Sequence, residues 1–93
     1  MKKYEISFIV SPNLDGEQVK STVENFKGVL TGKGAEVVKT DDLGLKTLAY
    51  EINDFNKGHY FVLEVNSTEE ANLEFDRLAK INENILRHII INL

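Results

Sequence analysis

YEISFIV, residues 4–10, alternates apolar and polar side chains with a period of two, which is typical of a β-strand with one buried face. Ile9 falls on the opposite face, beside polar neighbours. Pro12 and Asn13 end the strand, because proline lacks a ladder donor and asparagine favours turns. The face predicted to point into the core carries Tyr4, Ile6, Phe8 and Val10.

The next segment is predicted to be a helix over residues 16–33. Asp15 suits the N-cap position, and Glu17 lies where the helix dipole favours negative charge. Gly34 can adopt the left-handed conformation that commonly ends a helix. A single apolar stripe recurs at helical spacing and consists of Val19, Val23, Phe26 and Leu30.

Residues 35–52 are predicted to form one long extended strand, with a bulge or kink at residues 41–44. Residues 53–58 (NDFNKG) are rich in turn formers and predict a hairpin loop. The returning strand covers residues 59–65. Its two faces carry Phe61, Leu63 and Val65 on one side and Tyr60, Val62 and Glu64 on the other.

A second helix is predicted to follow, with a capping box formed by Ser67 and Glu70 at its start. Residues 82–84 (NEN) end this helix. Residues 85–91 are rich in β-branched side chains and predict a last strand, whose two faces are both largely apolar. The helix residues expected in the core are Ala71, Phe75, Leu78 and Ala79.

The element order is therefore βαββαβ, which predicts an α+β fold, the ferredoxin-like split β-α-β sandwich. Right-handed crossovers place the first and third strands at the centre of a four-stranded antiparallel sheet, with both helices on one face. We call the other face, which has no predicted cover, the open face. At 93 residues the chain has room for one domain, residues 1–93.

The composition is that of an ordinary folded protein, with 42% hydrophobic and 28% charged residues. The absence of cysteine excludes disulfides, thiolate metal sites and cysteine nucleophiles. No apolar run is long enough for a signal peptide or a membrane span, so a cytoplasmic protein without membrane contacts is expected. A net charge of −4 argues against a domain that coats nucleic acid by itself, because such binding depends on neutralising phosphates.

No sequence pattern predicts an enzyme, a cofactor, a metal site or a small-molecule substrate. His59 and His88 lack a carboxylate at zinc-ligand spacing and are interpreted as strand surface or edge residues. An acylphosphatase-like enzyme needs an arginine in the loop at residues 11–14, which has none. Residues 57–62 match the third-strand signature of an RNA-recognition motif only poorly. A ferredoxin-like regulatory or small-molecule-sensing homodimer remains an alternative.

Apolar side chains on the open face favour a docking surface for another macromolecule, because a soluble domain rarely exposes such a patch without a role. The last strand contributes to it whichever way it turns, since it cannot bury both of its faces. The predicted partner-binding residues are Ile9, Tyr60, Val62, Ile89 and Ile91.

Four segments show an order of residues that core packing and turn chemistry do not explain. They are residues 3–5 (KYE), 42–50 (DLGLKTLAY), 57–60 (KGHY) and 78–87 (LAKINENILR). The most specific part is LGLKTLAY, residues 43–50. Together these segments resemble the bacterial small-subunit ribosomal protein S6 family over essentially the whole chain.

The resemblance implies the fold derived above and a structural, ribosome-associated role without enzymatic activity. Members of the family pair with ribosomal protein S18, and the pair binds the central domain of the small-subunit ribosomal RNA. The family's basic pair before Leu-Ala-Tyr corresponds to Lys46 and Thr47 here, so one cation is missing and weaker RNA binding is expected. The RNA-binding residues that the resemblance implies are Lys2, Lys3, Lys46, Tyr50, Lys80 and Arg87.

Overall fold

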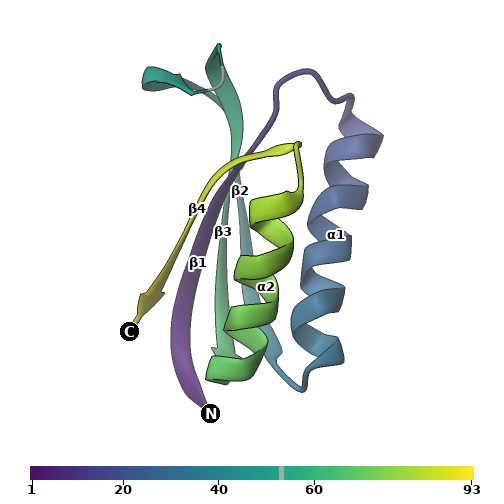
Figure 1. Cartoon of the computed structure of the whole chain (residues 1–93), viewed down its shortest axis with the longest axis vertical. Coiled ribbons are helices and arrows are strands. Elements are labelled where there is room, and N and C mark those ends of the chain that lie inside the picture. Colours follow the sequence, from purple (N-terminus) through teal and green to yellow (C-terminus); the bar gives the residue numbers. More distant parts are fainter. Residues whose placement is uncertain (53) are drawn as a thin grey trace.

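The structure is a computed structural model that describes residues 1–52 and 54–93. Within these residues, four strands and two helices follow one another in the predicted order (Figure 1). None of the described helices is long and apolar enough to cross a membrane. The elements are β1 (Lys2–Val10), α1 (Gly16–Gly32), β2 (Glu36–Ile52), β3 (Phe55–Ser67), α2 (Glu69–Ile81) and β4 (Ile85–Asn92).

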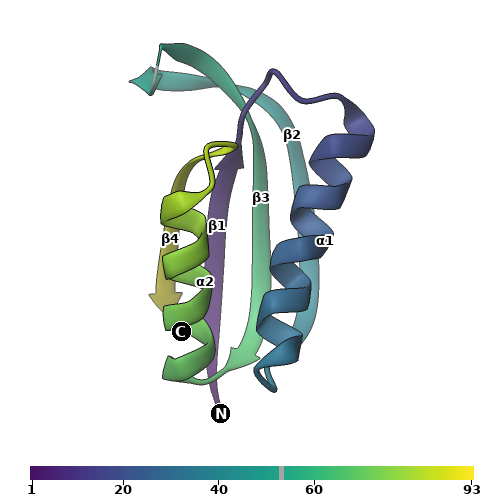
Figure 2. The ribbon, with the colours of Figure 1, turned by 45° about the vertical axis from the view of Figure 1, so that its right-hand side comes forward.

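The strands form one antiparallel sheet in the order β2-β3-β1-β4, so that β3 and β1 lie at its centre. Both helices pack on one face of this sheet, as two views of the ribbon show (Figures 1 and 2). The fold predicted from the element order, the ferredoxin-like sandwich, is therefore confirmed, and the open face is the side of the sheet without helices.

The core between sheet and helices is built around Phe8 in β1. Its ring stacks on Phe61 of β3 with the ring centroids 5.5 Å apart, and it also contacts Phe26 of α1 and Phe75 of α2. The last two rings meet each other at 5.2 Å, so a single aromatic group joins both helices to the two central strands. The predicted core face of β1 is confirmed, with Ile6, Phe8 and Val10 buried and Tyr4 packed at the margin.

Local sequence signals set both ends of α1. The carboxylate of the N-cap residue Asp15 accepts a hydrogen bond from the Gln18 backbone N–H at 2.8 Å, and the Gln18 side chain accepts one from the Asp15 N–H. This reciprocal arrangement satisfies two N–H groups at the start of the helix region. Gly34 has a φ of +86°, the left-handed conformation expected after the last turn. All four residues of the predicted apolar stripe are buried.

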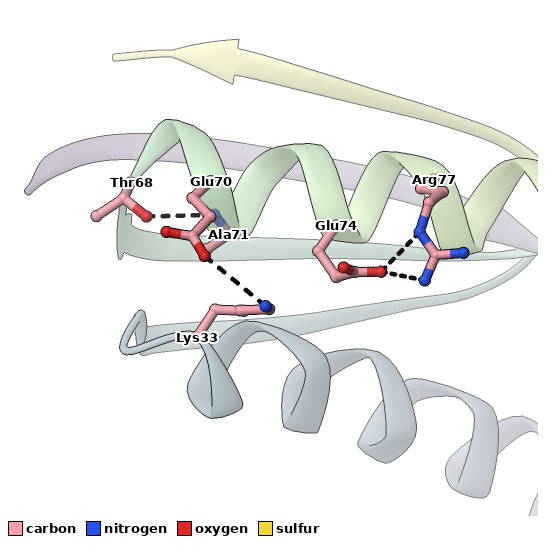
Figure 3. Close-up of polar contacts among 6 residues, drawn as sticks. All are labelled: Lys33, Thr68, Glu70, Ala71, Glu74 and Arg77. Atoms are coloured by element: carbon pink, nitrogen blue, oxygen red, sulfur yellow. Dashed lines mark hydrogen bonds and ion pairs between the residues drawn. The ribbon is translucent and has the colours of Figure 1, made fainter.

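The start of α2 corrects the predicted capping box. Ser67 still pairs with β1 and is buried at the end of β3, so the N-cap is Thr68. Its hydroxyl accepts a hydrogen bond from the Ala71 N–H at 3.2 Å (Figure 3). Glu70 instead forms an ion pair at 3.7 Å with Lys33, at the end of α1. The predicted Ser67–Glu70 capping box was wrong because Ser67 is still paired with β1 in the sheet, which moves the N-cap of the helix to the next residue.

The loop between β2 and β3 is shorter than predicted. Asn53 lies outside the described residues, and β3 already begins at Phe55. Asp54 has a φ of +67°, a left-handed conformation that aspartate tolerates in tight turns. Most of the predicted loop is therefore strand, which lengthens the hairpin.

The predicted irregularity within β2 is confirmed. The register of β2 against β3 shifts between Asp42 and Gly44. The Asp42 carboxylate accepts a hydrogen bond from the Gly44 N–H at 2.9 Å, and Gly44 has a φ of +80° that favours glycine. This local kink changes the direction of β2 just before its last eight residues.

A register shift also decides which side of β4 is buried. The pairing of β4 with β1 is irregular between Ile9 and Val10, so the alternation along β4 is interrupted at its start. Ile85 consequently packs in the main core, whereas the adjacent Leu86 packs on the open face. Beyond the shift, the helix side carries His88 and Ile90, and the open face carries Arg87, Ile89 and Ile91.

One polar contact ties β4 to α2. An imidazole nitrogen of His88 lies 2.6 Å from the Asp76 carboxylate, and the ring packs edge-on against Phe75. The hydrogen bond with His88, followed by the one from Lys80, holds the pKa of Asp76 below its ordinary value of 3.8. The ionised carboxylate therefore stabilises the fold above that value, and the contribution is lost as the pH falls through the lowered folded pKa.

We predict that Asp76→Asn lowers the free energy of unfolding at pH 7 by less than about 1 kcal/mol, because the pair is partly exposed. As the pH falls through the lowered pKa of Asp76, the wild-type carboxylate becomes protonated, and the urea midpoints of the two proteins should converge. Glu74→Gln serves as a control, since Glu74 bonds to Arg77 of the same helix (Figure 3). This variant should lower the free energy of unfolding at pH 7 by less than Asp76→Asn does. If Asp76→Asn were less stable than the wild type by the same free energy of unfolding at low pH, the loss would come from packing and not from the charge.

Candidate interface on the open face of the sheet

The end of the β2–β3 hairpin bends away from the helices and over the open face (Figure 1). Three apolar side chains lie buried beneath it and form what we call the open-face cluster: Ile9 of β1, Leu48 of β2 and Leu86 of β4. At its rim, the Arg87 guanidinium donates a hydrogen bond to the Tyr50 hydroxyl. Because β2 and β4 are the opposite edges of the sheet, this bond requires the hairpin to cross both central strands.

Gly58 allows β3 to pass close to the Ile9 side chain at the base of this hairpin end. A Cβ atom at position 58 would lie only 2.3 Å from Cγ2 of Ile9, and 3.4 Å from the carbonyl oxygen of Val10. The Ile9 side chain thus occupies the space that any larger residue in β3 would need. The glycine of the KGHY segment therefore has a packing role, which the sequence analysis did not assign.

Two adjoining hollows of about 240 and 250 Å³ lie on the open face beside the open-face cluster. The smaller extends beneath the hairpin to Leu48 and Tyr50. The larger extends along the strands to Ser7 and Val62. They form one continuous surface, since both are lined by Ile9, Tyr60, Arg87 and Ile89.

All five predicted partner-binding residues lie on this face, but their exposure differs. Ile89 and Ile91 are 47% and 46% exposed and offer the largest accessible apolar side chains of β4. Tyr60 and Val62 are half-buried on β3. Ile9 is only 8% exposed, so it forms the floor of the surface beneath the other four.

Three of the six predicted RNA-binding residues lie on the open face, and two of them, Tyr50 and Arg87, are in contact. Lys46 stands opposite Gly58 in the β2–β3 register and therefore lies on the open face. Lys46, Leu48 and Tyr50 alternate along β2, so they share that face, and the period of two in this segment was a signal for their grouping. Tyr50 is 61% exposed and is held beside Arg87 by their hydrogen bond.

The remaining three predicted RNA-binding residues lie elsewhere. Lys2 and Lys3 pair with the last residues of β3, at the opposite end of the sheet from the hairpin. Lys80 lies in the last turn of α2, where its ammonium group is 3.0 Å from the Asp76 carboxylate. The structure therefore does not join all six residues into one surface.

The open face carries apolar and cationic side chains that can contact a binding partner. In residues 1–52 and 54–93, no group of three His, Cys, Asp or Glu side chains is placed to hold a metal ion. What the face provides near the hairpin is an apolar floor, an exposed tyrosine and two cations, Lys46 and Arg87. Cations of this kind contact phosphates, and an exposed ring can stack on a base.

Comparisons with known proteins agree with the fold. A family model described as ribosomal protein S6 matches residues 3–92. Among solved structures, the chain is similar to the 30S ribosomal protein S6 of Thermotoga maritima, at 26% sequence identity and a TM-score of 0.94. That match covers 99% of this chain and 87% of the Thermotoga maritima chain.

We predict that Gly58→Ala destabilises the fold by about 1–3 kcal/mol, because the added methyl group overpacks against Ile9. Gly28→Ala is the matched control: it lies on the exposed side of α1 with open space around it and should stabilise by about 0.5–1 kcal/mol. Urea unfolding of both variants measures the two effects. Equal changes in the free energy of unfolding for the two variants would mean that the approach of β3 to Ile9 is not constrained at this position.

Proposed function

Because the chain belongs to the ribosomal protein S6 family, we propose that it binds the central domain of the small-subunit ribosomal RNA jointly with ribosomal protein S18. Membership of this family makes the chain a structural constituent of the small ribosomal subunit. We place its activity at the ribosome in the cytoplasm, as a protein that positions RNA and a protein partner without catalysing a reaction.

The observation that carries this proposal is that Lys46, Tyr50 and Arg87 lie on the open face beside an exposed apolar surface, with Tyr50 bonded to Arg87. Two cations can contact phosphates, which sets position and orientation without reading sequence. The Tyr50 ring can stack on an unpaired base, and its bond to Arg87 limits the directions in which both side chains point. The apolar surface beside them offers S18 a contact next to the RNA.

Joint binding also fits the charge of the chain. A protein with a net charge of −4 and few clustered cations obtains little affinity from phosphate contacts alone. If a partner holds the same RNA, each contact of this chain forms at a high effective concentration. Lys2, Lys3 and Lys80 would then make further, separate phosphate contacts from the far end of the sheet and from α2.

We predict that Lys46→Ala and Arg87→Ala weaken binding of the S18 pair to a central-domain RNA fragment by roughly tenfold or less at about 0.1 M salt. Each variant should also lower the slope of log affinity against log salt by about 1. Filter binding over a salt series measures both quantities. Lys20→Ala, an exposed lysine of α1 outside the predicted site, is the control and should bind as the wild type does.

Two results would contradict the proposal. Equal losses in Lys46→Ala and Lys20→Ala would show that the hairpin end of the open face is not the RNA surface. If the isolated chain bound the RNA fragment as tightly as the pair with S18 does, joint binding would be contradicted.

A further inference from the structure

Two carboxylates face each other on the open face without a cation between them. Glu5 of β1 stands directly opposite Glu64 of β3, and both side chains are half-buried. Like charges directly opposite in a sheet destabilise it. Lys39 of β2 lies opposite Glu64, but its ammonium group is 3.7 Å from Asp41 instead. Across residues 1–52 and 54–93, none of the ion pairs includes Glu5 or Glu64.

This acidic end is continuous with the apolar surface described above. A hollow of about 260 Å³ is lined by three carboxylates, one ammonium group and two apolar side chains: Glu5, Asp41, Glu64, Lys39, Val62 and Leu93. Val62 also lines the neighbouring apolar hollow. The chemical character of the open face therefore changes along the strands. It runs from Lys46 and Arg87 near the hairpin, over an apolar middle, to a group of carboxylates that share one lysine.

We propose that the open face seats a cationic, partly apolar segment of the protein partner, with a lysine or arginine of that segment between Glu5 and Glu64. The identity of the partner rests on the proposed function, whereas the chemistry of the segment follows from the charges of the face. A neutral segment would cover two carboxylates without compensating them, which is costly, and RNA phosphates would be repelled. A cation removes the repulsion between Glu5 and Glu64.

The distribution of charge also sets the direction in which the segment lies. Its cationic residue occupies the Glu5–Glu64 end, and its apolar side chains lie on Val62, Tyr60 and Ile89. The end near Arg87 and Lys46 remains free of partner cations, so it is open to phosphates. The protein partner and the RNA thus take different ends of one face.

The test is the double variant Glu5→Gln with Glu64→Gln, measured by calorimetric titration with purified S18. Affinity should fall roughly tenfold at low salt, and the loss should shrink at high salt as the charges are screened. In the absence of a partner, the same variant should unfold at an equal or higher urea concentration than wild type, because a repulsion is removed. Glu24→Gln with Glu83→Gln removes the same charge away from the open face and should leave the affinity unchanged.

A second measurement separates this inference from the proposed function. Amide chemical shifts of the labelled chain are followed while a synthetic peptide of alternating lysine and valine is added, and changes are expected around Glu5, Ser7, Val62 and Glu64. Such changes without any S18 complex would reject the proposed partner and keep the cationic segment. An S18 complex that the double variant does not weaken more than the control would reject the segment and keep the partner.

Two further outcomes overturn the inference. Peptide-induced shifts spread evenly over all acidic surfaces would show that Glu5 and Glu64 form no specific site. Self-association of the wild-type chain in sedimentation, abolished by Glu5→Gln with Glu64→Gln, would make a second copy of the chain the occupant of the open face.

Discussion

The structure depends on the burial of β1 from both sides near its C-terminal end. On one side, Phe8 joins the helices to the sheet through its contacts with three other rings. On the other side, Ile9 is covered by the hairpin and packs with Leu48 and Leu86. Helices alone could cover only the first side. A second, small core is therefore needed on the open face, and the long β2–β3 hairpin supplies it.

This second core determines the shape of the functional surface. By crossing the central strands, the hairpin brings Tyr50 of one edge strand to Arg87 of the other, and Lys46 lies on the same face of β2 as Tyr50. The rest of the open face stays uncovered and apolar. The surface that we propose for RNA and the surface that we propose for the protein partner consequently lie on one face of the sheet.

The two faces of the molecule also use charge differently. On the helix side, ion pairs join charged residues to one another within the chain, as in Lys33–Glu70, Glu74–Arg77 and Asp76–Lys80. On the open face, Lys39 pairs with Asp41, whereas Arg87 is bonded to the Tyr50 hydroxyl and Glu5 opposes Glu64. Arg87, Glu5 and Glu64 have no oppositely charged partner among the ion pairs of residues 1–52 and 54–93, so these charges of the open face are available to partners.

Much of this protein could be read from local patterns in its sequence. A period of two assigned the faces of β1 and β3, and a helical period assigned the stripe of α1, because the direction of a side chain depends on backbone geometry a few residues long. The element order then limited the topology to the ferredoxin-like sandwich, and LGLKTLAY indicated the family. The same local reasoning placed Ile9, Tyr60 and Val62 on the open face, but it left open which side of the last strand, with Ile89 and Ile91, faces outward.

Only the tertiary structure decided the remaining features, and each depends on residues distant in the chain. The open side of β4 follows from a register shift against β1, and the start of α2 moved because Ser67 remains paired with β1. The grouping of Tyr50 with Arg87 requires a hairpin that crosses the sheet, and the His88–Asp76 contact requires α2 to lie against β4. Sequence periodicity describes one element at a time, whereas register, crossing and charge pairing are set by how elements pack on one another.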